Sequence, residues 1–317
     1  MRHNDRNYVG LALATLLTWG LILSSVLALR GSRIHLVHLA DMALILIPIS
    51  FIFGVSAYCF IRQRMLRIGW ATWYLAICLL GWFGMSLAQY AAALGGRSDM
   101  SSAFVAADYA LGFDWPAYCA AILSHPAVST AMLNSYIQIM NEGLALTMLF
   151  IFLDRRDRMV EHAMIAVLCY VMATVLCSLF PTQTAPTAYG RPDLILDHPL
   201  VDQIAGLLSK SNVQIETIRG TVSFPSLHVS GGLLTIYLSR GIKWLLWPMA
   251  AFNAVVIAAT PVFGGHFFLD VLGGAGIFLI AVVVSKRLVN TRLPRERRRG
   301  AARLSSVWRL PRRQTAS

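Results

Sequence analysis

Eight long apolar segments, separated by short polar or basic stretches, dominate the chain. They extend over about Tyr8–Arg30, Leu39–Ile61, Ile68–Leu94, Ser129–Phe152, Val160–Phe180, Ser226–Ser239, Trp244–Val262 and His266–Ser285. A helix that crosses a bilayer needs roughly 20 mostly apolar residues, and only the sixth segment is clearly short. Backbone groups in lipid must be satisfied within the segment, and the alternating pattern of a barrel is missing. The sequence therefore predicts an all-α, polytopic transmembrane helix bundle with about eight spans.

The composition supports a membrane protein. Of the 317 residues, 57% are hydrophobic and only 13% are charged, whereas a soluble domain averages about 25% charged residues. So few charged groups cannot coat a water-facing surface. The five cysteines lie mostly within the apolar segments and have no metal-binding spacing, so we interpret them as small apolar residues.

The basic residues predict the orientation of the chain. Of the 27 Lys and Arg residues, 21 lie on one set of connections and 6 on the other. Because basic residues collect on the cytoplasmic side, we expect an inner (plasma) membrane protein with both termini in the cytoplasm. The net charge of +12 comes mostly from residues 286–317. A basic cluster beside a span binds anionic lipid headgroups, so we expect anionic lipids there and no nucleic acid.

Two connections on the outer side are long. The first, residues 95–128, carries aromatic residues at helical spacing with few charges, and it predicts one helix lying at the membrane interface. The second, residues 181–225, is rich in proline and contains a predicted short helix near Leu200–Leu208. Loops of this length are usually functional or disordered. The second leads directly into the start of the sixth apolar segment.

Two stretches place ionisable residues at the ends of apolar segments. Pro225–His228 begins the sixth segment, and His266 with Asp270 begins the eighth. Two spans joined by a basic turn at 240–243 separate the histidines, so both are predicted at the outer face. Residues four apart on a helix share a face, so Asp270 can hold one ring nitrogen of His266 and leave the other free. Ionisable residues at a membrane span are functional candidates by default.

Three kinds of chemistry use a serine, two histidines and an aspartate. A catalytic zinc site would take two histidines, an aspartate and water, but Asp270 could then no longer orient His266. A serine hydrolase would need Ser226 and His228, two residues apart, to face each other, which helical spacing disfavours. Phosphoryl transfer fits better, with one neutral imidazole attacking phosphorus and a protonated one donating to the leaving oxygen. We expect no metal ion and no cofactor.

The start of the sixth segment is suited to binding phosphate. Pro225 is predicted at the start of a helix, where proline is favoured. The N–H groups of Ser226, Leu227 and His228 would then be free to point at an anion. The Ser226 hydroxyl would add a further donor to the phosphate oxygens. We therefore predict that Ser226 and Leu227 bind substrate.

These stretches resemble the membrane-bound type 2 phosphatidic acid phosphatase superfamily. Its motifs read Pro-Ser-Gly-His and then Ser-Arg, five residues, His, three residues and Asp. The resemblance covers about residues 68–285 and implies that Ser226 binds phosphate, His228 is the acid, His266 is the nucleophile and Asp270 orients it. It divides the chain into two N-terminal transmembrane helices (1–67), a six-helix lipid phosphatase or phosphotransferase core (68–285) and a basic cytoplasmic tail (286–317).

The chain departs from the family's pattern in three places. Leu227 replaces the glycine, residues 259–260 read Ala-Thr instead of Ser-Arg, and the family's first element, Lys, six residues, Arg-Pro, is matched only in part over 184–192. A transferring phosphoryl group needs cationic neutralisation. Arg191 and Arg219 are therefore rival candidates for the arginine that binds phosphate.

The altered pattern is more similar to the branch that contains inositol-phosphorylceramide synthases. LGFDWPAY at 111–118, followed by a segment with Tyr136 and Gln138, is similar to bacterial members of that branch. The resemblance implies a phosphotransferase, favoured over a phosphatase, that acts on a lipid phosphate or phospholipid headgroup at the outer face through a phosphohistidine. A lipid or sugar alcohol would be the acceptor. The alternatives are a membrane transporter with Glu142 and Asp41 on an ion pathway, and a catalytically inactive lipid-binding member of the same fold.

Overall fold

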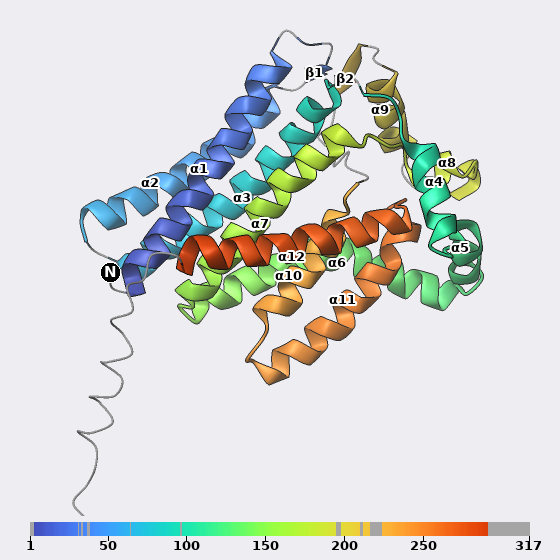
Figure 1. Cartoon of the computed structure of the whole chain (residues 1–317). Helices are drawn as coiled ribbons and strands as arrows, with labels where there is room; N and C mark the ends of the chain where they lie inside the picture. Colours follow the sequence, from blue (N-terminus) through green and yellow to red (C-terminus); the bar gives the residue numbers. More distant parts are fainter. Residues whose placement is uncertain are drawn as a thin grey trace, which may run out of the picture.

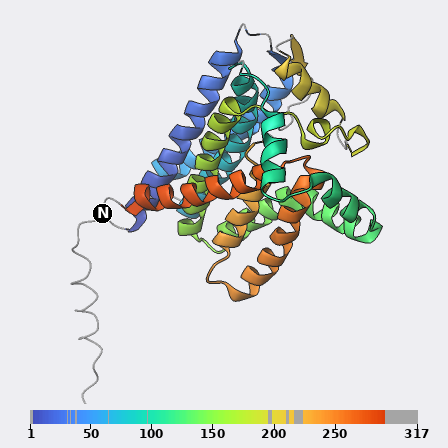
Figure 2. The ribbon, with the colours of Figure 1, turned by 45° about the vertical axis from the view of Figure 1, so that its right-hand side comes forward.

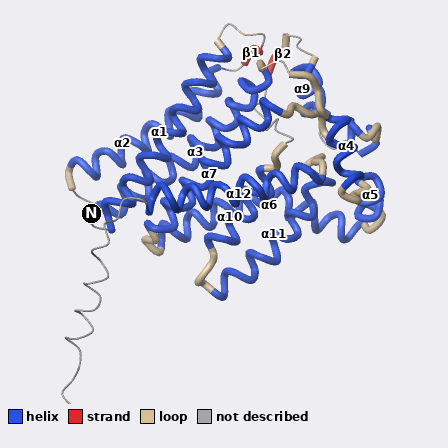
Figure 3. The backbone as a smooth tube through the Cα atoms, in the orientation of Figure 1, coloured by secondary structure: helices blue, strands red, loops and turns tan. Residues whose placement is uncertain are grey.

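The structure is an all-α bundle, as the apolar pattern predicts. The computed structural model describes residues 3–30, 32, 34–36, 39–63, 65–95, 97–194, 198–209, 212–215 and 224–290. Residues 291–317, which form most of the predicted basic tail, and Arg219 lie outside the described residues. The strands within the described ranges are the short parallel pair β1 (Ile34–Leu36) and β2 (Val213–Ile215), drawn in red in Figure 3.

Every predicted apolar segment contains a helix. The eight helices are α1 (His3–Leu29), α2 (Leu39–Ile61), α3 (Leu66–Ala93), α6 (Pro126–Phe152), α7 (Arg156–Leu179), α10 (Leu227–Leu238), α11 (Lys243–Phe263) and α12 (Phe268–Asn290). Six of them, α1, α3, α6, α7, α11 and α12, are long and apolar enough to cross a membrane. The apolar stretches Leu46–Ile61 of α2 and Leu227–Leu238 of α10 are shorter. The chain is thus a multi-pass membrane protein, and α10 has only 12 residues.

The long outer connections fold into short helices. The first contains α4 (Ser101–Ala110) and α5 (Trp115–Leu123), and the second contains α8 (Ala185–Ala188), the 3₁₀ turn Pro192–Leu194 and α9 (His198–Leu208). The prediction of one interfacial helix in the first connection was wrong. Gly112 adopts φ 77°, and Asp114 caps a new helix by accepting a hydrogen bond from the Ala117 N–H at 2.9 Å. The predicted helix near 200–208 is confirmed by α9.

The helices pack as two groups that meet along α7 and α12. Helices α1, α2, α3 and α7 form one group, and α6, α10 and α11 form the other. Helix α7 contacts α6 and α10 directly, and α12 contacts α7, α10 and α11. Figure 1 and the rotated view in Figure 2 show the start of α1 and the end of α12 at the same end of the bundle. The short helices α4, α5, α8 and α9 lie away from that end.

Two hydrophobic clusters matter for the position of the site. The larger one draws on α1, α3, α6, α7, α10 and α12, and its fully buried members include Trp70, Tyr74 and Phe150. A smaller cluster contains Phe104, Trp115, Cys119, Ala185, Val262 and Phe267. It packs α4, α5 and α8 against the turn between α11 and α12, so the short outer helices form a fixed support for that turn.

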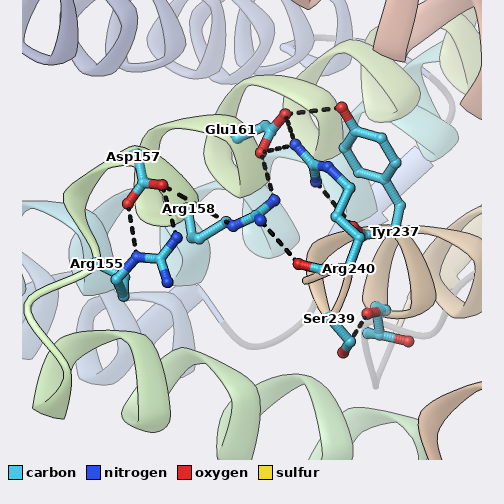
Figure 4. Close-up of polar contacts among 8 residues, drawn as sticks. Arg155, Asp157, Arg158, Glu161, Tyr237, Ser239 and Arg240 are labelled. Atoms are coloured by element: carbon cyan, nitrogen blue, oxygen red, sulfur yellow. Dashed lines mark hydrogen bonds and ion pairs between the residues drawn. The ribbon is translucent and has the colours of Figure 1, made fainter. Parts of the chain in front are cut away.

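A network of charged side chains fixes the C-terminal end of α10. The carboxylate of Glu161, near the start of α7, accepts hydrogen bonds from Arg158 and from Arg240, which follows α10 (Figure 4). The hydroxyl of Tyr237 also donates to Glu161, at 2.7 Å, and the Arg240 guanidinium lies 3.7 Å from the centroid of the Tyr237 ring. Ion pairs with several partners and limited exposure hold geometry better than single surface pairs. Helix α10 is therefore tied to α7 at this end.

Candidate active site

His266 and Asp270 form a buried pair at the turn between α11 and α12. Nδ1 of His266 lies 3.0 Å from Oδ2 of Asp270, and the same oxygen accepts the Phe267 N–H at 2.9 Å. The exposed fractions are 5% for His266 and 0% for Asp270. The helix begins at Phe268, so His266 precedes it, but the predicted contact across four residues is present. The carboxylate holds Nδ1 and leaves Nε2 as the reactive nitrogen.

Ser226 faces that nitrogen. Its hydroxyl oxygen lies 3.4 Å from Nε2 of His266, and the residue is fully buried. Ser226 occupies the N-cap position of α10, yet its side chain makes no capping hydrogen bond. N-cap serines usually accept an N–H of the first turn. Here the hydroxyl is directed to the histidine instead.

The first turn of α10 differs from the prediction in two respects. The helix begins at Leu227, so Pro225 precedes the N-cap and is not part of the first turn. The Ser226 N–H donates to the Asp270 carbonyl at 3.0 Å, so it is not free to bind an anion. The N–H groups of Leu227 and His228 have no backbone acceptor within the described residues. Of the three predicted donors, Leu227 and His228 thus have no backbone partner among the residues that the structure describes, and Ser226 has one.

His228 lies beside Tyr136 of α6. Nδ1 of His228 is 3.1 Å from the Tyr136 hydroxyl, and the two rings stack with centroids 4.1 Å apart and an interplanar angle of 16°. A Cβ atom on Gly264 would lie 2.6 Å from the Tyr136 hydroxyl and 2.6 Å from Cδ2 of His266, so the hydroxyl that contacts His228 also lies beside the second imidazole. The structure thus brings Ser226, both histidines and Asp270 together, as the spacing predicted.

Two glycines let α10 begin directly against α12. A Cβ atom at Gly273 would lie 2.5 Å from the Phe224 ring, and one at Gly274 would lie 2.4 Å from the carbonyl oxygen of Ser226. Real Cβ atoms essentially never approach other atoms so closely. A side chain at Gly274 would displace the Ser226 backbone, whereas one at Gly273 would displace the Phe224 ring. The absence of a side chain at Gly274 is therefore a condition of the site's geometry.

Asp108 of α4 caps α12 from a distance. Its carboxylate is fully buried and accepts the N–H groups of Phe268 and Leu269, both at 3.0 Å, and the hydroxyl of Tyr189 at 3.2 Å. Burial raises the pKa of the Asp108 carboxyl, and the two N–H donors oppose that rise. Asp108 therefore fixes the first turn of α12, directly after His266.

Trp115 adds a second support. Its indole N–H lies 3.1 Å from both the Pro261 and the His266 carbonyl oxygens. The turn that carries His266 is therefore held from α4, by Asp108, and from α5, by Trp115.

Comparison with protein families agrees with this arrangement. A model of the PAP2 superfamily, the type 2 phosphatidic acid phosphatases, matches residues 102–284. The chain belongs to the PAP2 superfamily. Members are generally phosphatases or phosphotransferases of lipid phosphates, which supports an enzyme of this general type. No curated protein and no solved structure gave a significant match to the chain.

The PAP2 pattern includes an arginine that this chain lacks, and the corresponding position lies near the end of α11. Residues Ala259 and Thr260, which stand in place of Ser-Arg, are fully buried in α11, and the Thr260 hydroxyl donates to the Val256 carbonyl at 2.9 Å. No cation comes from this position. Within the described residues, no group of three or more His, Cys, Asp and Glu side chains could hold a metal ion.

Arg191 lies on the loop that packs against the His266 turn. The Ala185 N–H donates to the Gly265 carbonyl at 2.8 Å, and the Arg191 N–H donates to the Pro186 carbonyl at 2.8 Å. The guanidinium itself forms two hydrogen bonds with Asp193, at 2.9 and 2.7 Å. Asp193 raises the pKa of Arg191, and Arg191 lowers that of Asp193. The structure thus places the Arg191 backbone near the site and its side chain on Asp193.

Glu142, the acidic residue of the transporter alternative, is bonded to a neighbouring helix. Its Oε1 accepts the side-chain N–H of Asn253 at 2.5 Å, which links α6 to α11. Asn253 is fully buried, and its side-chain nitrogen also donates to the Met249 carbonyl at 2.9 Å. Interhelical hydrogen bonds of this kind are a common use of polar residues in membrane bundles.

Proposed function

We propose that this protein is a phosphotransferase or phosphatase that acts on a lipid phosphate or phospholipid headgroup through a phosphohistidine at His266. The observation that supports the proposal most strongly is the chain of contacts from Asp270 through His266 to Ser226. The carboxylate holds Nδ1 at 3.0 Å, so Nε2 is left facing the Ser226 hydroxyl at 3.4 Å. A nucleophile oriented by a third group in this way is the general signature of covalent catalysis.

The proposed reaction has two steps. In the first, Nε2 of His266 forms a bond to phosphorus as the bond from phosphorus to the leaving oxygen breaks, and His228 gives its proton to that oxygen. In the second, water or an alcohol attacks the phosphohistidine, its proton passes to His228, and Nε2 is released. Ser226 and the N–H groups of Leu227 and His228 hold the phosphoryl oxygens.

We propose transfer to an alcohol rather than to water as the second step. The support is the similarity to the inositol-phosphorylceramide synthase branch, which is an analogy at the family level. The acceptor would be a lipid or sugar hydroxyl. We propose that the reaction takes place at the outer face of the inner membrane, and the distribution of Lys and Arg supports this side.

The phosphate also needs a cation, which Arg191 or Arg219 would supply. Arg191 would have to exchange Asp193 for the phosphate, and the position of its backbone beside the His266 turn supports that role. A guanidinium binds carboxylate and phosphate with the same planar pair of donors, so the exchange preserves its hydrogen bonding.

The experiment compares membrane lipids, by mass spectrometry, from cells that express wild type and His266→Ala at equal levels. We expect at least one lipid phosphate or phospholipid to change only with the wild type. A product with a bare hydroxyl indicates a phosphatase, and a new phosphorylated headgroup indicates a transferase. Identical lipid profiles in a panel of hosts that differ in their phospholipids would contradict the proposal and favour an inactive lipid-binding protein.

A further inference from the structure

The two histidines of the site have different partners. Nδ1 of His266 is held by the Asp270 carboxylate at 3.0 Å, whereas Nδ1 of His228 is held by the Tyr136 hydroxyl at 3.1 Å. Tyr136 comes from α6, a helix that carries none of the predicted catalytic or phosphate-binding residues. Its ring also covers the face of the His228 imidazole, so one side chain fixes both the plane and the rotation of that ring.

We propose that Tyr136 is a positioning residue that fits His228 for donating the proton to the leaving oxygen. This inference rests on the reaction proposed above. A phenol oxygen can accept a hydrogen bond from Nδ1–H whether or not the imidazole is charged. With its proton kept at Nδ1, the ring can exchange a proton only through Nε2, which is the nitrogen available to the substrate.

The chemistry of the two partners separates the roles of the histidines. A carboxylate stabilises positive charge on His266, and that charge develops when Nε2 bonds to phosphorus. A phenol is neutral, so it orients His228 but stabilises its cation much less. The histidine beside the carboxylate is suited to be the nucleophile, and the one beside the phenol is suited to be the acid.

Gly264 shows how closely Tyr136 is placed between the two histidines. A Cβ atom on Gly264 would lie 2.6 Å from the Tyr136 hydroxyl and 2.6 Å from Cδ2 of His266. The hydroxyl, the glycine and the second imidazole are thus packed together without space for a methyl group. This packing restricts the Tyr136 hydroxyl to the position from which it reaches His228.

The test uses Tyr136→Phe, which removes the hydroxyl and keeps the ring. The matched control is Tyr118→Phe, which removes a hydroxyl that donates to the Ala258 carbonyl of α11 at 2.8 Å. Two probes are supplied in detergent micelles to the purified full chain: hexadecyl phosphate, and a nitrophenyl phosphate with an alkyl chain of the same length. An alkoxide needs a proton in order to leave, whereas a nitrophenolate leaves without one.

We expect Tyr136→Phe to slow hexadecyl phosphate turnover about 10- to 100-fold, part of the roughly 10²–10⁴-fold that general acid catalysis supplies. Turnover of the nitrophenyl probe should change by less than about threefold, because its leaving group needs no acid. Tyr118→Phe should leave both rates near those of the wild type. Equal losses on both probes would mean that Tyr136 only supports the fold, and no loss on either would remove it from the mechanism.

His266→Ala separates this inference from the proposed function. If that variant turns over both probes as fast as the wild type, or if the wild type turns over neither with water or with an added long-chain alcohol as the acceptor, the proposed function is wrong. If His266→Ala is inactive while Tyr136→Phe turns over both probes at the rate of the wild type, only the role proposed for Tyr136 is wrong.

Discussion

At the scale of single residues, Ser226 occupies an N-cap position, but its side chain does not cap the helix. A serine at an N-cap normally stabilises its helix by about 0.5–2 kcal/mol relative to alanine. Ser226 makes no such bond, and its hydroxyl faces His266 at 3.4 Å. The helix start is instead held by the backbone bond from the Ser226 N–H to the Asp270 carbonyl. Function and folding therefore use different atoms of one residue.

Ser226→Ala should for this reason reduce turnover far more than stability. Losing one preorganised donor to a developing anion costs about 10²-fold in rate, while no capping bond is lost. The control is Ser230→Ala, one turn further along α10, whose hydroxyl donates to the Leu227 carbonyl at 3.2 Å. Turnover and the midpoint of thermal unfolding are measured for both variants. A drop in stability without a drop in turnover for Ser226→Ala would contradict this account of the hydroxyl.

At the scale of elements, the crossing of α10 and α12 depends on where glycine stands in α12. At Gly274 an added Cβ would meet the Ser226 carbonyl at 2.4 Å and the Val229 side chain at 2.9 Å, whereas at Gly276 nothing lies within 4 Å. The two glycines are half a turn apart on one helix. They therefore form a matched pair: a side chain at Gly274 would separate the two helices, and one at Gly276 would not.

Gly274→Ala should separate the two helices and impair the site. Overpacking of a tight contact costs about 1–3 kcal/mol, and we expect a lower unfolding midpoint together with lower turnover. Gly276→Ala should be neutral or stabilising, because alanine favours the helix by about 0.8–1.0 kcal/mol over glycine. Similar behaviour of the two variants would show that the close approach at Gly274 is not required.

The sequence predicts contacts that follow from local spacing and misses those made by distant elements. His266 and Asp270 are four residues apart, and the down-and-back path of two spans is enough to bring His228 near them. Tyr136 lies 92 residues from His228, and Asp108 lies 160 residues from Phe268. Helical periodicity carries no information about such pairs, since they depend on which helices are neighbours.

The break between α4 and α5 is a different case, because the sequence did contain its signal. A glycine that can adopt positive φ and an aspartate followed by proline are typical of a helix end and a new N-cap. Gly112 and Asp114–Pro116 have this pattern. The aromatic residues at helical spacing on both sides concealed it.

At the scale of the whole molecule, the candidate active site and the Glu161 network lie at opposite ends of α10. The turns after α2, α6 and α10 carry basic residues of the predicted cytoplasmic side. Helices α4, α5 and α8 surround the site on the predicted outer side. This separation matches the distribution of Lys and Arg, which predicts that the site lies at the outer face.

Labelling of single cysteines tests this orientation. Ser124, exposed after α5, and Lys243, exposed at the start of α11, are suitable positions at the two ends. We expect a membrane-impermeant maleimide to label Ser124→Cys in intact cells and Lys243→Cys only after the membrane is opened. The wild type, whose five cysteines are buried or partly buried, is the control. The reverse labelling pattern would place the site in the cytoplasm.

The shortness of α10 sets how deep the chemistry takes place. Its 12 residues extend over about 18 Å, whereas the hydrocarbon layer is about 30 Å thick. If Arg240 stays at one headgroup layer, Ser226 and His228 lie about 9 and 12 Å or more, respectively, beneath the opposite one. A lipid phosphate would then reach the site only when its headgroup moves below the level of the neighbouring headgroups, while its acyl chains stay in the hydrocarbon layer. The depth of the site would then exclude water-soluble phosphates, and no pocket that recognises the acyl chain would be needed.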